Sequence, residues 1–173
     1  MSPDSLTSIT ADGPLLEVLE ARVAKTLLVS DLETVSRSRL VKVHIDTLLA
    51  EVAALLSSSQ ISLVVVCDTQ GRAVGVITET ILVRQLGFGK ADVFTTRADQ
   101  VMARNFTTCR VSDALAELLA LMHQGGLIQV TVIDDDGRPV GIVNARDGLR
   151  ALLAQGHFEE SLLRNYVMGV GYQ

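Results

Sequence analysis

The acidic and imidazole side chains are the first groups to consider for chemistry, because both can ligate metal ions. Three aspartates stand together at 134–136, and the histidines are His44, His123 and His157. The histidines show no spacing typical of zinc ligands. Aspartate also starts tight turns, and Gly137 follows the aspartate run directly. The pattern therefore predicts a turn at 134–137 and no metal site.

The serines and cysteines offer no nucleophile in a catalytic setting. Ser57-Ser58-Ser59 has neither the flanking glycines of a nucleophile elbow nor an evident partner histidine. Cys67 and Cys109 are not arranged as Cys-x-x-Cys. Two isolated cysteines of this kind are typical of small core residues in a reducing compartment. A phosphate-cradling P-loop is also lacking. These observations predict that the protein is not an enzyme.

A duplicated segment organises the chain. Residues 68–77, Asp-Thr-Gln-Gly-Arg-Ala-Val-Gly-Val-Ile, recur at 134–143 as Asp-Asp-Asp-Gly-Arg-Pro-Val-Gly-Ile-Val, at an offset of 66. The same offset aligns Leu49-Ala50-Glu51 with Leu115-Ala116-Glu117 without gaps. Because the two copies are homologous along their length, each element predicted in one copy can be checked in the other.

Hydrophobic periodicity predicts the same five elements in each copy. A short strand precedes a helix with one apolar stripe, at 48–56 in the first copy and 115–122 in the second. Asp46-Thr47 and Ser112-Asp113 are predicted to cap these helices. The later elements are strands at 61–67 and 127–133, strands at 73–78 and 140–144, and helices at 80–86 and 147–153. The predicted fold is α/β (α+β), with the unit strand, helix, strand, strand, helix used twice.

The repeat also sets the predicted domain boundaries. The chain divides into an N-terminal tail and helix at 1–32, repeat 1 at 33–90, repeat 2 at 97–154, and a C-terminal helix and tail at 155–173. The N-terminal helix has Leu15, Leu16 and Leu19 on one side. Further helices are predicted at 98–103 and 159–168.

The repeat resembles the CBS-domain family, and the tandem pair resembles a Bateman module of the small stand-alone bacterial type. The resemblance covers about residues 33–153. It rests on the motif Asp-x-x-Gly-Arg-x-Val-Gly, on the run Asp99-Gln100-Val101-Met102 before the second copy, and on the duplication itself. It implies two repeats about a pseudo-two-fold axis. Between them lie two clefts that can take adenosine compounds such as AMP, ADP, ATP or S-adenosylmethionine.

The family's ribose motif is Gly-h-h-(Thr/Ser)-x-x-Asp, where h is apolar. Its carboxylate, at a helix start, can accept hydrogen bonds from both ribose hydroxyls. In repeat 2 the motif spans 141–147 and retains Asp147, with Asn144 in the hydroxyl position. In repeat 1 it spans 75–81 and retains Thr78, but Ile81 replaces the carboxylate. The resemblance therefore implies one binding cleft and one degenerate cleft.

Three more residues become candidates through the same resemblance. Arg146 would lie beside a phosphate, and the strand that holds Thr107 and Thr108 lines the adenine pocket in relatives. Each site residue also has a structural alternative. Asp147 is suited to capping a helix, Arg146 to a solvated surface, and the two threonines to the outward positions of an edge strand.

Composition restricts the partners. With 15 Lys+Arg against 20 Asp+Glu the net charge is -5, whereas non-specific nucleic-acid binding requires a basic face. No apolar run approaches about 18 residues, and the N-terminus does not resemble a signal peptide, so no membrane contact and a cytoplasmic location are expected. The helix at 80–86 is apolar on nearly all sides, which predicts burial in a homodimer.

The expected function is regulation by an adenosine nucleotide, with AMP as the first candidate. No cofactor is required, and the homodimer would act on a separate, unknown client protein. The alternative is a ligand-free dimerisation or protein-interaction module with degenerate sites, which Ile81 and Asn144 favour. A nucleotide hydrolase is disfavoured because no base or nucleophile is apparent.

Overall fold

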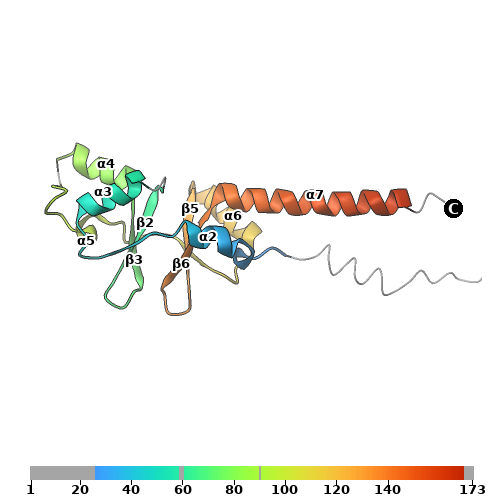
Figure 1. Ribbon diagram of the computed structural model, residues 1–173, viewed down its shortest axis with the longest axis horizontal. Coiled ribbons are helices and arrows are strands. Elements are labelled where there is room, and N and C mark those ends of the chain that lie inside the picture. The colour runs from blue at the N-terminus through green and yellow to red at the C-terminus, as the bar shows by residue number, and fades with distance from the viewer. Residues whose placement is uncertain (1–25, 59–60, 90, 170–173) are drawn as a thin grey trace, which may run out of the picture. The chain divides into compact units, whose positions relative to one another are not determined.

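The computed structural model describes residues 26–58, 61–89 and 91–169 (Figure 1). The predicted N-terminal helix and the tail after Gly169 lie outside the described residues. One compact unit, Leu27–Gly156, contains both repeats, and the second unit includes the helical residues from His157 onward. Both candidate clefts belong to the first unit.

Repeat 1 forms a three-stranded mixed sheet with two helices. Its elements are β1 (Lys42–His44), α3 (Leu49–Ser58), β2 (Leu63–Cys67), β3 (Ala73–Thr78) and α4 (Glu79–Gly87). Strand β2 is central, parallel to β1 and antiparallel to β3. Its sequence, Leu-Val-Val-Val-Cys, is buried at all five positions. Such a β-branched run suits a strand that is covered on both faces.

Repeat 2 has the same order, directions and register. Its elements are β4 (Thr108–Arg110), α6 (Leu115–Gly125), β5 (Gln129–Ile133), β6 (Pro139–Asn144) and α7 (Ala145–Gly169). Val64 pairs with Ile77 in repeat 1, as Val130 pairs with Val143 in repeat 2. Both sheets also have a register shift at the end of the central strand. The predicted duplicate fold is confirmed.

The two hairpin turns are built in the same way. One carboxylate oxygen of Asp68, and likewise of Asp134, accepts the backbone N–H groups two and four residues later, at 2.8–3.0 Å. The bond from the Arg72 N–H is the largest cause of a lowered pKa of Asp68. Gly71 and Gly137 adopt φ of 78° and 79°, which favours glycine. The predicted turn at 134–137 is therefore confirmed.

The segment that precedes each repeat packs on the other repeat. The short helices η1 (Val29–Leu32) and α2 (Glu33–Ser38) lead into strand β1 of repeat 1, but α2 contacts β6 of repeat 2. The Val29 N–H donates to the Asp113 carbonyl at 2.9 Å. Helix α5 (Ala98–Val101) precedes repeat 2, yet the Ala98 N–H donates to the Thr47 carbonyl at 2.8 Å. The segment that leads into repeat 1 thus packs on repeat 2, and the segment that leads into repeat 2 packs on repeat 1. We call this reciprocal arrangement the exchange of leading segments.

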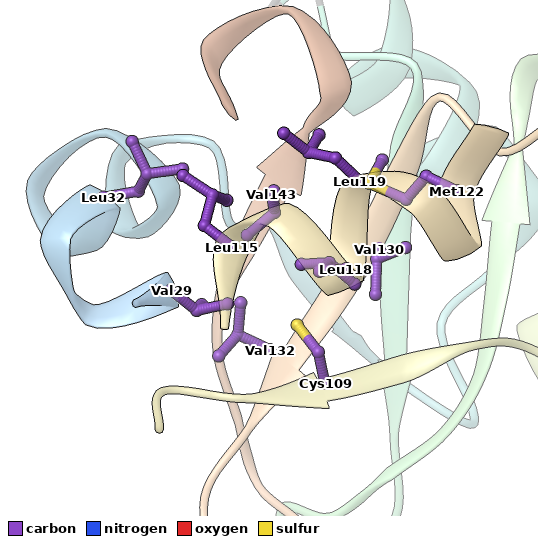
Figure 2. Close-up of a cluster of buried hydrophobic side chains, with 10 residues drawn as sticks. All are labelled: Val29, Leu32, Cys109, Leu115, Leu118, Leu119, Met122, Val130, Val132 and Val143. Atoms are coloured by element: carbon purple, nitrogen blue, oxygen red, sulfur yellow. The ribbon is translucent and has the colours of Figure 1, made fainter. Parts of the chain in front are cut away.

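The exchanged segments complete the hydrophobic cores. Figure 2 shows Val29 and Leu32 beside the side chains of helix α6 and strand β5. Val29 is 1% exposed, so it belongs fully to the core of repeat 2. Ala98 and Met102 are buried in the core of repeat 1 in the same manner.

The second glycine of the repeated motif, Gly75 or Gly141, allows the leading segment to pack closely on the last strand of the sheet. A Cβ on Gly141 would lie 2.7 Å from Ser36 Oγ and 3.2 Å from the Ser36 carbonyl carbon. A Cβ on Gly75 would lie 2.5 Å from Met102 Sδ. Ser36 and Met102 are related by the offset of 66, so the two contacts are equivalent.

Two predictions of local structure are wrong. Asp113 does not cap helix α6, whose N-cap is Ala114 without a side-chain bond, because its carboxylate accepts the Arg110 N–H at 2.8 Å. The helices predicted at 147–153 and 159–168 form the single helix α7. The residues between them include Gly156 but no proline, and one glycine costs a helix only about 1 kcal/mol.

Candidate ligand-binding clefts

Cleft 1 is lined by repeat 1 around the start of helix α4, by residues within the segment 103–107, and by residues within 126–131 of repeat 2. It has a volume of about 520 Å³, and its lining includes Thr78, Ile81 and Thr107. The Thr78 hydroxyl accepts the Ile81 N–H at 3.2 Å and so caps helix α4. Ser62 donates to the Gln129 side-chain oxygen at 2.9 Å, and both residues line the cleft. Because Ile81 is apolar, the motif position in the first turn of α4 has no carboxylate, although Glu79 in the same turn also lines the cleft.

Cleft 2 lies at the start of helix α7 and has a volume of about 720 Å³. Asn144 and Arg146 line it, and the Asn144 side-chain oxygen accepts the Arg146 N–H at 2.9 Å. Its remaining lining residues are Arg39, Ile128, Leu149, Arg150 and Leu153. The cleft therefore combines guanidinium groups with exposed apolar side chains.

Asp147 is held by a residue that the sequence analysis did not identify. Arg39 Nε donates to Asp147 Oδ2 at 2.5 Å, between residues 108 positions apart. The side chain of Asp147 is only 10% exposed, against 38% for Arg39. The offset of 66 relates Arg39 to Asn105, which lines cleft 1. This equivalence is the sequence signal that could have identified Arg39 as a residue of cleft 2.

The six predicted site residues do not form one site. Asn144 and Arg146 line cleft 2, where Asp147 is paired to the lining residue Arg39. Thr78 and Thr107 line cleft 1 instead. Thr108 lines neither of these clefts; it begins strand β4 with its side chain exposed.

The buried cysteines have no features of nucleophiles. Desolvation is the main cause of a raised pKa for Cys67, and it raises the pKa of Cys109 to about 12. Both thiols therefore hold their protons at neutral pH, whereas the thiolate is the reactive form. Within the described residues, no group of three or more His, Cys, Asp or Glu could hold a metal ion. The helices in this part of the chain include none long and apolar enough to cross a membrane.

Comparison with known proteins decides the family. The CBS domain matches the chain twice, at residues 29–87 and 98–154. The chain belongs to the CBS-domain family. Each match covers one strand, helix, strand, strand, helix unit and the segment that leads into it, so the chain contains a tandem CBS pair.

Solved CBS pairs have the same fold. The crystal structure of the CBS domain pair of protein MJ0100, in complex with 5'-methylthioadenosine and S-adenosyl-L-methionine, is 25% identical with a TM-score of 0.64. The similarity covers 75% of this chain and 98% of that chain. The CBS-domain containing protein ATU1752 from Agrobacterium tumefaciens is 28% identical with a TM-score of 0.63, covering 74% and 95%.

Two of the curated relatives are much longer proteins. The uncharacterized protein MJ1404 of Methanocaldococcus jannaschii is 32% identical over 128 residues, covering 72% of this chain and 30% of that protein. The arabinose 5-phosphate isomerase KdsD of Pseudomonas aeruginosa is 37% identical over 91 residues, covering 53% of this chain and 28% of that protein. The CBS pair thus spans less than a third of these relatives.

Proposed function

We propose that this CBS pair is a non-catalytic regulatory module that binds an adenosine ligand in cleft 2. The observation that supports this most directly is the position of Asp147. Its carboxylate lies in the first turn of α7, is largely buried, and is bonded to a residue that lines the cleft. A carboxylate in this position suits a ribose diol, since each hydroxyl can donate a charge-assisted hydrogen bond.

The other groups of cleft 2 match the remaining parts of a nucleotide. Asn144 can donate and accept beside the sugar, and Arg146 can bind a phosphate. Ile128 and Leu149, which are 71% and 53% exposed, offer apolar surface for a base. AMP is the simplest ligand with all three parts. The similarity to the CBS pair of MJ0100, which was crystallised with adenosine compounds, supports the ligand class.

Binding to one cleft per chain is the expected stoichiometry. Ile81 in cleft 1 cannot accept a hydrogen bond from a diol, although Thr78 and Thr107 remain there. Calorimetric titration of the purified protein with AMP should therefore give one site per chain, and Asp147→Asn should weaken binding at least about a hundredfold. Thermal denaturation of the same variant shows whether it is folded. AMP binding that is unchanged in folded Asp147→Asn would contradict the proposal.

The module is proposed to act as a homodimer on a separate client protein. Val83 on α4 and Leu149 on α7 are related by the offset of 66 and are 67% and 53% exposed. Equivalent helices of both repeats thus expose apolar side chains, which is typical of an interaction surface. Ligand binding across two repeats would favour one arrangement of the dimer, and the client would respond to that arrangement.

The second candidate is a ligand-free interaction module. The ion pair between Arg39 and Asp147 favours it, because the carboxylate needed for ribose is already bonded within the protein. This function predicts no stabilisation by any adenosine compound. A ligand at 100 times its dissociation constant stabilises a protein by about 2.7 kcal/mol, so a thermal-shift series with adenosine, AMP, ATP and S-adenosylmethionine separates the two candidates.

A further inference from the structure

Cleft 2 concentrates positive charge in a protein of net charge -5. Arg39, Arg146 and Arg150 all line it, and Asp147 is the carboxylate paired with the first of them. The three guanidinium groups of the lining and the one paired carboxylate together leave an excess of two positive charges. In cleft 1 the counterparts of Arg39 and Arg146 are the neutral residues Asn105 and Thr80. The charge is therefore a property of one cleft and not of the repeat.

Two of these arginines have no carboxylate partner in the described part of the chain. Arg146 and Arg150 are exposed, and neither forms an ion pair with a described residue. They are four residues apart on α7, so they share a face and their like charges repel. An anion bound between them would relieve that repulsion.

The pair between Arg39 and Asp147 makes an uncharged ligand a poor fit. A ribose diol that uses both carboxylate oxygens of Asp147 must compete at Oδ2 with the charge-assisted bond of 2.5 Å from Arg39, in a side chain that is 10% exposed. Hydroxyl donors alone replace this bond with weaker ones and leave Arg39 without its anion. A ligand that also has phosphates supplies Arg39 with a new anionic partner.

We propose that cleft 2 selects anionic, phosphate-bearing nucleosides, and that Arg39 determines this selectivity by exchanging Asp147 for the ligand phosphates. This inference rests on the proposed function and narrows its ligand class. The cleft then disfavours uncharged adenosine, because Arg39 competes with the ribose for Asp147 and adenosine has no phosphate to bind Arg39 in return. It also disfavours S-adenosylmethionine, whose sulfonium adds positive charge beside Arg146 and Arg150.

The test is a calorimetric titration of the full chain with ATP, AMP, adenosine and S-adenosylmethionine. We expect ATP and AMP to bind more tightly than adenosine, and S-adenosylmethionine to bind most weakly. Arg39→Asn, which introduces the residue found in cleft 1, should tighten adenosine and weaken ATP, so that the ratio of the two affinities falls at least about tenfold. Arg150→Gln should weaken ATP about tenfold and change the affinity for adenosine much less.

The matched control is Arg84→Gln. Arg84 is the counterpart of Arg150 on α4, is exposed and does not line cleft 2, so this variant should change neither affinity. If Arg39→Asn tightens ATP and adenosine equally, Arg39 only obstructs the cleft and the inference is wrong. If S-adenosylmethionine binds the unmodified protein as tightly as ATP, the charge selectivity is wrong while the adenosine-binding function stands. If no adenosine compound binds either the unmodified protein or Arg39→Asn, the proposed function itself fails.

Discussion

Arg39, the residue that ends helix α2, is bonded to Asp147 in the first turn of α7. The pair connects the segment that leads into repeat 1 with the closing helix of repeat 2. Helix α2 itself packs on β6 of repeat 2, so the exchange of leading segments brings the arginine to this cleft. The local chemistry of cleft 2 is thus a consequence of the exchange.

The exchange of segments predicts that Val29 stabilises repeat 2. Val29→Ala should lower the free energy of unfolding by about 2 kcal/mol, because a fully buried side chain loses two methyl groups. Val35→Ala is the control, since this helix residue is 40% exposed and should cost little. Urea denaturation followed by circular dichroism measures both. Equal effects of the two variants would show that Val29 is not part of the core.

The motif glycines should differ in their tolerance of a side chain. Gly141→Ala places a Cβ against the backbone of Ser36, which cannot rotate away, and should cost about 1–3 kcal/mol. Gly75→Ala meets Met102, whose Sδ and Cγ can rotate away while its Cβ, at 3.0 Å, stays fixed, and should cost less because no backbone carbonyl is involved. Gly87→Ala is the control, because nothing lies within 4 Å of the added Cβ. Chemical denaturation of the three variants should give that order, and a tolerated Gly141→Ala would contradict the close contact.

The sequence was sufficient to predict most of this fold. The offset of 66 required both repeats to share one topology, and the apolar runs were long enough to mark β2 and β5. It was not sufficient to predict which repeat the leading segments contact. Val29 and Ala98 are apolar residues beside the repeat that follows them, and only tertiary packing assigns them to the other one.

The candidate site was only partly predictable for the same reason. Asp147 and Asn144 could be identified because they lie three positions apart within one short sequence motif. Arg39 is 108 residues from its partner, and no local pattern connects the two. Thr107 was predicted on the first strand of repeat 2, but it lies just before β4, in the segment that lines cleft 1. Residues contributed by the opposite repeat require the arrangement of the repeats to be known.

The buried thiol of Cys109 predicts a loss of stability at high pH. Desolvation raises its pKa from 9.0 to about 12, so the folded protein holds this proton more tightly than the unfolded chain. The stabilisation is complete below pH 9 and is lost as the pH rises from about 9 to about 12, with a slope of up to about 1.4 kcal/mol per unit. Cys109→Ala should show a shallower decline in the free energy of unfolding over this interval. Identical slopes would exclude the contribution of this thiol.

The proposed dimer predicts sensitivity at Val83. Val83→Arg places a charge on the exposed apolar surface of α4 and should weaken self-association, because the charge would have to be desolvated at the interface. Val111→Arg, at a site 44% exposed outside the helices, is the control and should leave the dimer intact. Light scattering over a concentration series measures the mass. A monomer mass for the unmodified protein at micromolar concentration would contradict the dimer.

The last prediction concerns the carboxylate of the ribose motif, which Ile81 replaces in cleft 1. Ile81→Asp restores it in the first turn of α4, where the helix dipole favours a negative charge and Thr78 and Thr107 are already in place. The residue in the position of Arg39 is Asn105, so no guanidinium competes for the new carboxylate. In the Ile81→Asp protein, cleft 1 should therefore bind uncharged adenosine more tightly than cleft 2 does.

This gain is best measured in a protein whose cleft 2 is disabled. Ile81→Asp combined with Asp147→Asn should bind one adenosine per chain, with little preference for ATP because cleft 1 has no arginine in its lining. The control replaces the same isoleucine with asparagine, which has the shape of aspartate without its charge, in the same Asp147→Asn background. If the aspartate and asparagine proteins bind adenosine equally, the carboxylate does not hold the ribose. The assignment of Asp147 by the shared motif would then be wrong as well.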